Sequence, residues 1–216
     1  MKRKNIVIIG TGGLAKEVKG LIDDINCHEI QWNLLGFIDN WEKQKGDIII
    51  DDKMVVGTTD DLNNRSNEIY VAIAIAGKME WKKEAILQIT NHNIQFPNLI
   101  HPSTLIRPDI KIGKGNILQP YSAVSCNVKI GDFNFVNSYC SIGHDTQIGS
   151  YNIFSPKTII SGHVTIGSEN VFGMNSCVLE KKCIGNNNRI GACSFIMRSI
   201  KNDCFYFGVP AKKITI

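Results

Sequence analysis

The sequence predicts an α/β domain of Rossmann-like βαβ type followed by an all-β parallel β-helix. Before about residue 95, apolar residues follow strand and helix periods around a glycine-rich turn, whereas from Ile100 onward every sixth residue is apolar. The polar residues change as well: Lys, Glu and Asp dominate the first part, and Asn, Ser and Gly dominate the second. We therefore expect two domains in the 216-residue chain, residues 1–97 and residues 98–216.

The first part contains the opening elements of a βαβ unit. Lys4–Gly10 is a continuous apolar run that ends in glycine, which is typical of a buried parallel strand. Further strands are expected at residues 34–39, 70–77 and 94–99, and a second helix at 81–90. The first helix follows the glycines, and its apolar face comprises Leu14, Val18, Leu21, Ile22 and Ile25.

The glycine turn between the first strand and helix has the spacing of a phosphate-binding loop. Gly10, Gly12 and Ala15 match G-x-G-x-x-A, and Asp39 ends the second predicted strand. Amides at a helix N-terminus bind phosphate, and an acidic side chain at the second strand can bind a ribose hydroxyl. A domain this short leaves no second mononucleotide-binding half, which disfavours NAD. Glycines that only form a tight turn remain the alternative.

The second part contains an unbroken six-residue repeat. A prism of three short parallel strands per turn explains this period, whereas a helix or an alternating hairpin sheet does not. The apolar residue would point inward once per face, and the Gly or Asn that follows would take the corner, where a positive φ costs little. The seventeen positions, which predict between five and six coils, are Ile100, Ile106, Ile112, Leu118, Val124, Ile130, Val136, Ile142, Ile148, Phe154, Ile160, Ile166, Phe172, Val178, Ile184, Ile190 and Ile196.

Composition and charge exclude several classes of protein. Apolar residues make up 43% and charged residues 20%, which are ordinary globular values. The net charge of +4 is scattered along the chain and does not indicate nucleic-acid binding. No apolar run reaches membrane-spanning length, and the basic N-terminus is followed by too short an apolar run for a secretory signal. The seven cysteines have no metal-ligand spacing, which predicts reduced thiols in a cytoplasmic protein.

One segment in the middle of the repeat carries candidate catalytic residues. His144 lies two residues after the inward-pointing Ile142, at an outward corner, and Asp145 follows it. Acyl transfer needs a base, and a carboxylate that fixes the imidazole tautomer strengthens such a base. Asn137 lies seven residues earlier, near the preceding face. A surface histidine that hydrogen-bonds to the backbone is the alternative interpretation of His144.

Over essentially its whole length the chain resembles the bacterial hexapeptide-repeat sugar acetyltransferases. These include sialic-acid O-acetyltransferases and N-acetyltransferases of nucleotide-linked 4-amino-4,6-dideoxy sugars. The resemblance rests on FID at the second strand, N-x6-H-[DE] in the middle coils, SGxVxIG one coil later and GVPAK near the end. It implies a left-handed β-helix, a homotrimer with active sites between subunits, and acetyl-CoA as co-substrate. It also implies that His144 is the general base, that Asp145 raises its basicity, and that Asn137 is a nearby polar contact.

The resemblance also implies two sets of binding residues. The glycine loop would hold a UDP-, dTDP- or GDP-linked sugar rather than NAD. His163, one of the implied acetyl-CoA contacts, could equally be an ordinary corner residue. Lys212 or Lys213 could lie near the coenzyme phosphates or belong to a solvated tail. The implied sugar-nucleotide contacts are Gly12, Gly13, Leu14, Asp39, Asn40 and Ala76. The implied acetyl-CoA contacts are Ile153, Gly162, His163, Met174 and Ala192.

We therefore expect an acetyl-CoA-dependent N-acetyltransferase that acts on a nucleotide-linked amino sugar for a surface glycan such as O-antigen. O-acetylation of sialic acid or a related sugar is the first alternative, and a non-catalytic trimeric sugar-nucleotide-binding scaffold is the second. A γ-type carbonic anhydrase has the same prism but needs three zinc-binding histidines. This domain has only His101, His144 and His163, and His101 lies far from the others, so no metal is expected.

Overall fold

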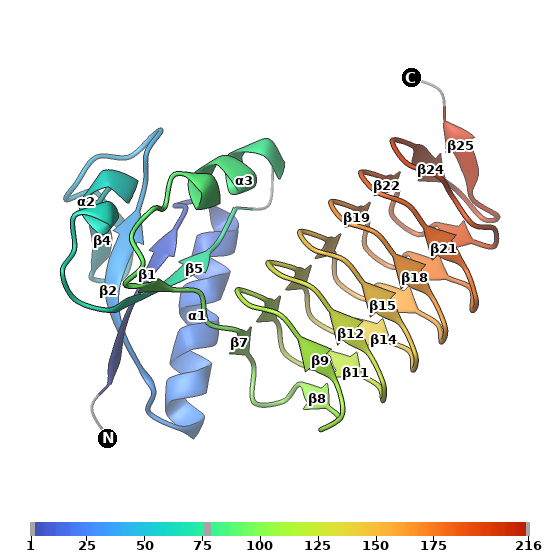
Figure 1. Cartoon of the computed structure of the whole chain (residues 1–216), viewed down its shortest axis with the longest axis horizontal. Helices are drawn as coiled ribbons and strands as arrows, with labels where there is room; N and C mark the ends of the chain where they lie inside the picture. The colour runs from blue at the N-terminus through green and yellow to red at the C-terminus, as the bar shows by residue number, and fades with distance from the viewer. Residues whose placement is uncertain (1–2, 76–78, 215–216) are drawn as a thin grey trace. The chain divides into compact units, whose positions relative to one another are not determined.

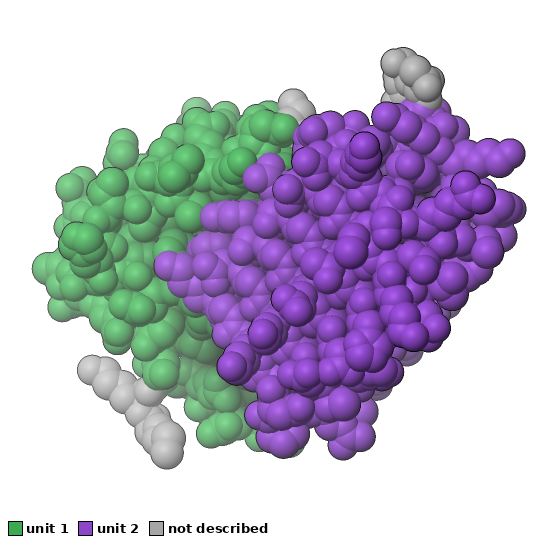
Figure 2. All heavy atoms as spheres, turned by 45° about the vertical axis from the view of Figure 1, so that its right-hand side comes forward, with its two compact units in different colours: residues 1–99 green, residues 100–216 purple. Residues whose placement is uncertain are grey.

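The computed structural model describes residues 3–75 and 79–214. The chain divides into two compact units, Met1–Leu99 and Ile100–Ile216 (Figure 2). The division falls two residues after the boundary expected from the sequence. Among the described residues, no helix combines the length and apolar character that crossing a membrane requires.

Unit 1 is a mostly parallel sheet with helices in its connections (Figure 1). The strand order is β3-β4-β2-β1-β5-β6, in which β3 and β4 pair antiparallel and the other pairs are parallel. The predicted βαβ unit, formed by β1, α1 and β2, is confirmed. The elements are β1 (Lys4–Ile9), α1 (Gly13–His28), β2 (Trp32–Ile38), β3 (Ile48–Ile50), β4 (Lys53–Gly57), α2 (Thr59–Asn63), β5 (Ile69–Ile73), α3 (Met79–Leu87) and β6 (Ile94–Gln95).

The core of unit 1 lies around β1. Ile6 to Ile9 are fully buried, and α1 buries Val18, Leu21, Ile22 and Ile25 as predicted, whereas Leu14 is only half-buried. The sequence patterns did not predict the β3–β4 hairpin or α2. The last predicted strand is in fact two short ones, β6 and the first strand of the repeat region.

Unit 2 is a parallel β-helix whose coils stack along one axis (Figure 1). Its first face comprises β7, β10, β13, β16, β19 and β22; its second face β8, β11, β14, β17, β20 and β23; and its third face β9, β12, β15, β18 and β21. Paired residues on successive coils are 18 positions apart, which is three hexapeptides, except at the last coil, where Arg189 pairs with Phe205. The strands are β7 (Leu99–Ile100), β8 (Leu105–Ile106), β9 (Lys111–Ile112), β10 (Ile117–Leu118), β11 (Ala123–Val124), β12 (Lys129–Ile130), β13 (Phe135–Val136), β14 (Ser141–Ile142), β15 (Gln147–Ile148), β16 (Ile153–Phe154), β17 (Ile159–Ile160), β18 (Thr165–Ile166), β19 (Val171–Phe172), β20 (Cys177–Val178), β21 (Cys183–Ile184), β22 (Arg189–Ile190), β23 (Phe195–Ile196), β24 (Phe205–Phe207) and β25 (Lys212–Ile214).

The repeated apolar residues fill the interior of this prism, as predicted. From Leu118 to Ile196, every sixth residue is at most 5% exposed. Ile100, Ile106 and Ile112, which belong to the first coil, are only partly buried against this core.

A ladder of buried asparagines runs through the same interior at 18-residue spacing. At the last of the five, Asn188 Oδ1 accepts the N–H of Cys204 over 3.0 Å. In each of the four earlier ones, Oδ1 accepts hydrogen bonds of 2.8–3.0 Å from the backbone N–H and the Nδ2 of the next asparagine. Nδ2 also donates to a glycine carbonyl one coil further on. The buried amides are thereby satisfied without water. The ladder comprises Asn116, Asn134, Asn152, Asn170 and Asn188.

The predicted place of the corner conformation is wrong. The left-handed backbone falls on the third residue after the inward apolar residue, as at Tyr139 (φ +61°) and Asp145 (φ +58°), and not on the Gly or Asn that directly follows. The glycines have another role, because adjacent coils approach too closely for a side chain there. A Cβ on Gly143 would lie 2.5 Å from the backbone nitrogen of Gly162.

Candidate active site

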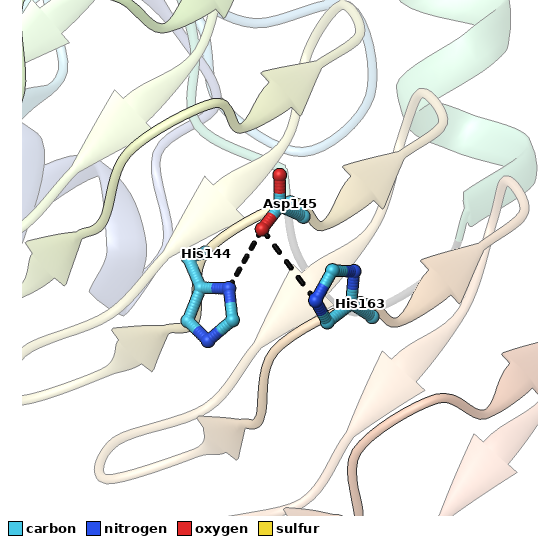
Figure 3. Close-up of side chains that lie close together, drawn as sticks. All are labelled: His144, Asp145 and His163. Carbon is cyan, nitrogen blue, oxygen red and sulfur yellow. Dashed lines mark hydrogen bonds and ion pairs between the residues drawn. The ribbon is translucent and has the colours of Figure 1, made fainter.

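His144 and Asp145 form a hydrogen-bonded pair at the corner that follows β14, between the second and third faces (Figure 3). His144 Nδ1 lies 2.7 Å from Asp145 Oδ2. Because an ionised carboxylate only accepts, Nδ1 carries the hydrogen and Nε2 keeps a lone pair. The His144 side chain is 53% exposed. The corner therefore presents an oriented imidazole whose free nitrogen can accept a proton.

Asp145 is held by residues from both neighbouring coils. Asn127 Nδ2, one coil before, donates to Asp145 Oδ1 over 2.6 Å. His163 Nε2, one coil after, lies 3.6 Å from Asp145 Oδ2, too long for a hydrogen bond but within ion-pair distance once that imidazole is protonated. Hydrogen bonds from His144 and then Asn127 hold the pKa of the Asp145 carboxyl below its usual range. Asp145 is therefore ionised at neutral pH.

Asn127, Asp145, His163 and Lys181 occupy one corner position on successive coils, which we call the corner column. All four have a left-handed backbone, with φ between +53° and +58°. The sequence interpretation missed Asn127, and it placed His163 among the acetyl-CoA contacts rather than beside Asp145. The 18-residue spacing of the repeat was the signal that could have found both.

Gly162 makes room for the His144 imidazole. A Cβ on Gly162 would lie 2.7 Å from Nε2, and the three atoms nearest to it all belong to the His144 ring. The ring of His163 approaches His144 edge-on, with 5.0 Å between the ring centroids. The imidazole of His144 is thus positioned by Asp145, His163 and the absence of a side chain at residue 162.

The same cluster has the composition of a transition-metal site. One potential ligand atom from each of His144, Asp145 and His163 lies within 4.8 Å of the others. Two imidazoles and a carboxylate suit ions such as Zn²⁺. The sequence-based argument against zinc rested on His101, which is not a member of this group.

The structure does not join Asn137 to this pair. Asn137 lies at the corner before β14, whereas His144 lies at the corner after it. Its side-chain oxygen accepts a 2.7 Å hydrogen bond from the N–H of Ser138. Within the described residues, none of its hydrogen bonds reaches His144 or Asp145.

The five residues predicted to contact acetyl-CoA lie in different places. Gly162 and His163 lie at the corner after the second face, while Met174 and Ala192 lie, exposed, at the corner before it. Ile153 is on the first face and is only 7% exposed. Within one chain these residues flank the second face on both sides rather than forming one cluster.

The glycine loop of unit 1 borders a pocket of about 510 Å³ at the carboxyl ends of β1, β2 and β5. Its lining includes Gly12, Gly13, Leu14 and Asp39, which the sequence analysis assigned to the sugar nucleotide. The other lining residues are Gly10, Thr11, Trp41, Glu42, Ala74, Ile75 and Trp81. The sequence interpretation named neither tryptophan, because no repeat or motif marks them.

Glycine is present in this loop for different reasons at Gly10 and at Gly12 and Gly13. Gly10 has φ +110°, and a Cβ there would lie 2.7 Å from the Ala74 carbonyl oxygen, so the fold itself requires glycine. A Cβ on Gly12 or Gly13 would meet nothing within 4 Å. Glycine at these two positions instead leaves the N-terminus of α1 open, where unpaired helix amides favour a phosphate.

Asp39 and Asn40 are already engaged within the protein. Asp39 is 5% exposed; its Oδ1 accepts the N–H groups of Trp41 (2.7 Å) and Glu42 (2.9 Å), and its Oδ2 accepts the Thr11 hydroxyl. Burial raises the pKa of the Asp39 carboxyl, but these hydrogen bonds outweigh it and the pKa lies below the usual range. Asn40 is bonded to Thr59 and Gln88. Ala76, the remaining predicted contact, lies outside the described residues.

Comparison with known proteins finds a family model that matches part of the first domain and solved structures that are similar over both domains. Residues 5–86 match the family model of the PglD N-terminal domain. Perosamine N-acetyltransferase from Caulobacter crescentus, solved with CoA and GDP-perosamine, is 23% identical with a TM-score of 0.87, covering 98% of this chain and 97% of that one. WeeI from Acinetobacter baumannii is 23% identical with a TM-score of 0.86, covering 98% and 100%. The acetyltransferase domain of PglB from Neisseria gonorrhoeae is 20% identical with a TM-score of 0.76, covering 98% and 100%. No curated protein matches the sequence.

The chain is thus a two-domain hexapeptide-repeat protein with the fold of these sugar acetyltransferases, including the predicted left-handed β-helix. Within its first domain, residues 5–86 are similar to the PglD N-terminal domain. The fold implied by the resemblance is therefore confirmed.

Proposed function

We propose that this protein is an acetyl-CoA-dependent N-acetyltransferase that acts on the amino group of a nucleotide-linked 4-amino-4,6-dideoxy sugar. The observation that carries the proposal is the 2.7 Å hydrogen bond from His144 Nδ1 to Asp145, which leaves Nε2 as an exposed base. A scaffold without catalysis has no need of a histidine whose tautomer is fixed in this way.

His144 acts as the general base in direct transfer. The neutral amine of the sugar attacks the thioester carbonyl carbon of acetyl-CoA, and Nε2 takes the proton that the nitrogen loses. The tetrahedral intermediate then expels the coenzyme thiolate, which receives that proton from the imidazolium. Asp145 keeps the imidazole in the required tautomer and stabilises its charged form. This route needs no metal, because the imidazole supported by Asp145 supplies the base.

The acceptor is a sugar nucleotide bound by the first domain, residues 1–97 in the sequence prediction. The open glycines at the N-terminus of α1 and the adjoining pocket of about 510 Å³ support this assignment. The C. crescentus relative was solved with GDP-perosamine, a sugar nucleotide. We assign the reaction to surface-glycan biosynthesis in the cytoplasm, where seven unpaired thiols would remain reduced.

The working form is a homotrimer built by the β-helix. The second face points apolar side chains outward, among them Leu105 (56% exposed) and Ile159 (46% exposed), and Tyr121 and Tyr139 stack at its edge. An exposed apolar surface of this kind favours burial against a second copy. Such packing would cover the face between Met174 and His163, so that acetyl-CoA lies between subunits.

The test is acetyl transfer by wild type and His144→Ala, measured by mass spectrometry with acetyl-CoA and UDP-, dTDP- or GDP-linked 4-amino sugars. We expect turnover with one nucleotide class and a fall of about 10²–10⁴-fold in kcat for His144→Ala. His92→Ala, which removes an exposed histidine of unit 1, serves as the matched control. Acetylation of sialic acid instead would establish the O-acetyltransferase alternative. A His144→Ala variant with normal kcat would refute the base mechanism.

A further inference from the structure

Two tryptophans from different elements lie together in the pocket of unit 1. Trp41 follows β2, and Trp81 belongs to α3, which follows β5. In the sheet these strands flank β1, whose end leads into the glycine loop. The two indole rings are nearly parallel, at 12°, with centroids 6.1 Å apart. Both rings line the pocket together with Gly12 and Gly13.

The turn that carries Trp41 is held by Asp39 and Asn40, which the sequence analysis assigned to direct contact with the sugar nucleotide. Asp39 Oδ1 accepts the N–H of Trp41, and Asp39 Oδ2 accepts the hydroxyl of Thr11 in the glycine loop. Asn40 anchors the same turn to the N–H of Thr59 over 2.9 Å. With both carboxylate oxygens of Asp39 occupied, the side chain acts as a positioning residue that ties the Trp41 turn to the glycine loop.

The pocket combines two chemistries that belong to one class of ligand. Open amides at a helix N-terminus suit a phosphate, and the flat faces of indole suit a planar aromatic ring. A nucleoside diphosphate carries both groups. Stacking does not use the hydrogen-bonding edge of the base. A base can therefore bind between aromatic rings even though the Asp39 and Asn40 side chains are already hydrogen-bonded within the protein.

We propose that Trp41 and Trp81 clamp the nucleobase of the sugar nucleotide between their rings, and that Asp39 holds the clamp in place. This inference rests on the proposed function. An aromatic ring between two others needs about 7 Å between the outer planes, twice the contact distance of carbon atoms. The centroid distance of 6.1 Å sets the upper bound on the separation of the two indole planes, so the rings must part by at least about 1 Å to admit a base.

The test uses indole fluorescence with UDP, dTDP, GDP and inorganic pyrophosphate as probes and no coenzyme present. The chain has three tryptophans, and Trp32 is 6% exposed and packs edge-on against Tyr70, so Trp32→Phe is the matched control. At least one nucleotide should quench wild type and Trp32→Phe equally, and pyrophosphate should not quench. Trp41→Ala and Trp81→Ala should each weaken binding of that nucleotide by about 5- to 150-fold, and Trp41→Phe by much less.

The outcomes separate the clamp from the proposed function. Unchanged affinity in both alanine variants, with wild type still binding, would overturn the clamp while leaving the sugar-nucleotide acceptor intact. Failure of wild type to bind any of the three nucleotides at millimolar concentration would overturn both. Circular dichroism identifies an alanine variant that has not folded, in which case Trp41→Leu and Trp81→Leu give the comparison. Isothermal titration calorimetry supplies affinities for variants that have lost their fluorescent reporter.

Discussion

Gly162→Ala would displace the proposed base without disturbing the prism. The new Cβ would lie 2.7 Å from His144 Nε2, and ordinary contact begins at 3.4 Å, so the ring must move by at least 0.7 Å. The nearest atoms are all at the end of one flexible, half-exposed side chain, so the ring moves rather than the backbone. A misplacement of about 1 Å can cost 10²-fold in rate, so we expect kcat to fall by about 10- to 100-fold. Steady-state acetylation with an amino-sugar acceptor measures it.

A double-mutant cycle with His144→Ala tests the cause of this loss. If the imidazole mediates the effect, Gly162→Ala should cost little further kcat in the His144→Ala background. Gly162 was predicted from the sequence as an acetyl-CoA contact. If Gly162 acts as an acetyl-CoA contact, Gly162→Ala would instead raise the KM for acetyl-CoA equally in the wild-type and His144→Ala backgrounds. Normal kcat in the single Gly162→Ala variant would refute the placement of the base.

Three further predictions concern the glycine loop, the ladder and the corner carboxylate. Gly12→Val should leave the thermal midpoint unchanged but raise the KM for the sugar nucleotide. Gly10→Ala should destabilise the fold by about 1–3 kcal/mol, and equal thermal midpoints in the two variants would contradict this difference. Asn152→Ala breaks several buried hydrogen bonds and should lower the free energy of unfolding in urea by about 3–5 kcal/mol; a loss under about 1 kcal/mol would contradict the ladder. The pKa of the Asp145 carboxyl is lower in the folded protein than in the unfolded chain, so its ionised form stabilises the fold. This stabilisation is fully present above the unfolded-state pKa and is lost as the pH falls through the folded-state pKa. Asp145→Asn should therefore lower the thermal midpoint at pH 7, with a difference from wild type that shrinks below about pH 4; a difference independent of pH would contradict it.

The prism was predictable because its information is periodic and local. Residues from Leu118 to Ile196 repeat one pattern, so a single inward direction explains them all. The position of the left-handed corner was not predictable in this way. Glycines such as Gly143 were interpreted as the left-handed residues, but glycine is required there because the next coil approaches too closely for a side chain. The hairpin of β3 and β4 was missed because strands of three and five residues around Asp51 leave too short a pattern.

The candidate site was predictable only where its residues are adjacent in sequence. His144 and Asp145 are neighbours, and their pairing follows from the corner. Asn127 reaches Asp145 from another coil, a contact that requires combining the 18-residue spacing with a side-chain direction. Trp41 and Trp81 meet across the end of β1 with no periodic relation between them, so their proximity is a tertiary property.

The corner column has a consequence for how such proteins diversify. Its backbone has φ near +55° whether the residue is Asn127, Asp145, His163 or Lys181. The N–H groups of Asp145, His163 and Lys181 donate to main-chain carbonyls of the coil before, whereas that of Asn127 donates to the Asp109 carboxylate. The conformation costs about 1–2 kcal/mol for each residue that is not glycine, and the stacked coils meet this cost at every turn. At Asp145, His163 and Lys181, where main-chain carbonyls hold the backbone, side-chain identity is therefore largely uncoupled from the fold. Exchanging one residue there can create or remove a reactive group while the scaffold keeps its shape, which makes this edge a natural place for new specificities to evolve.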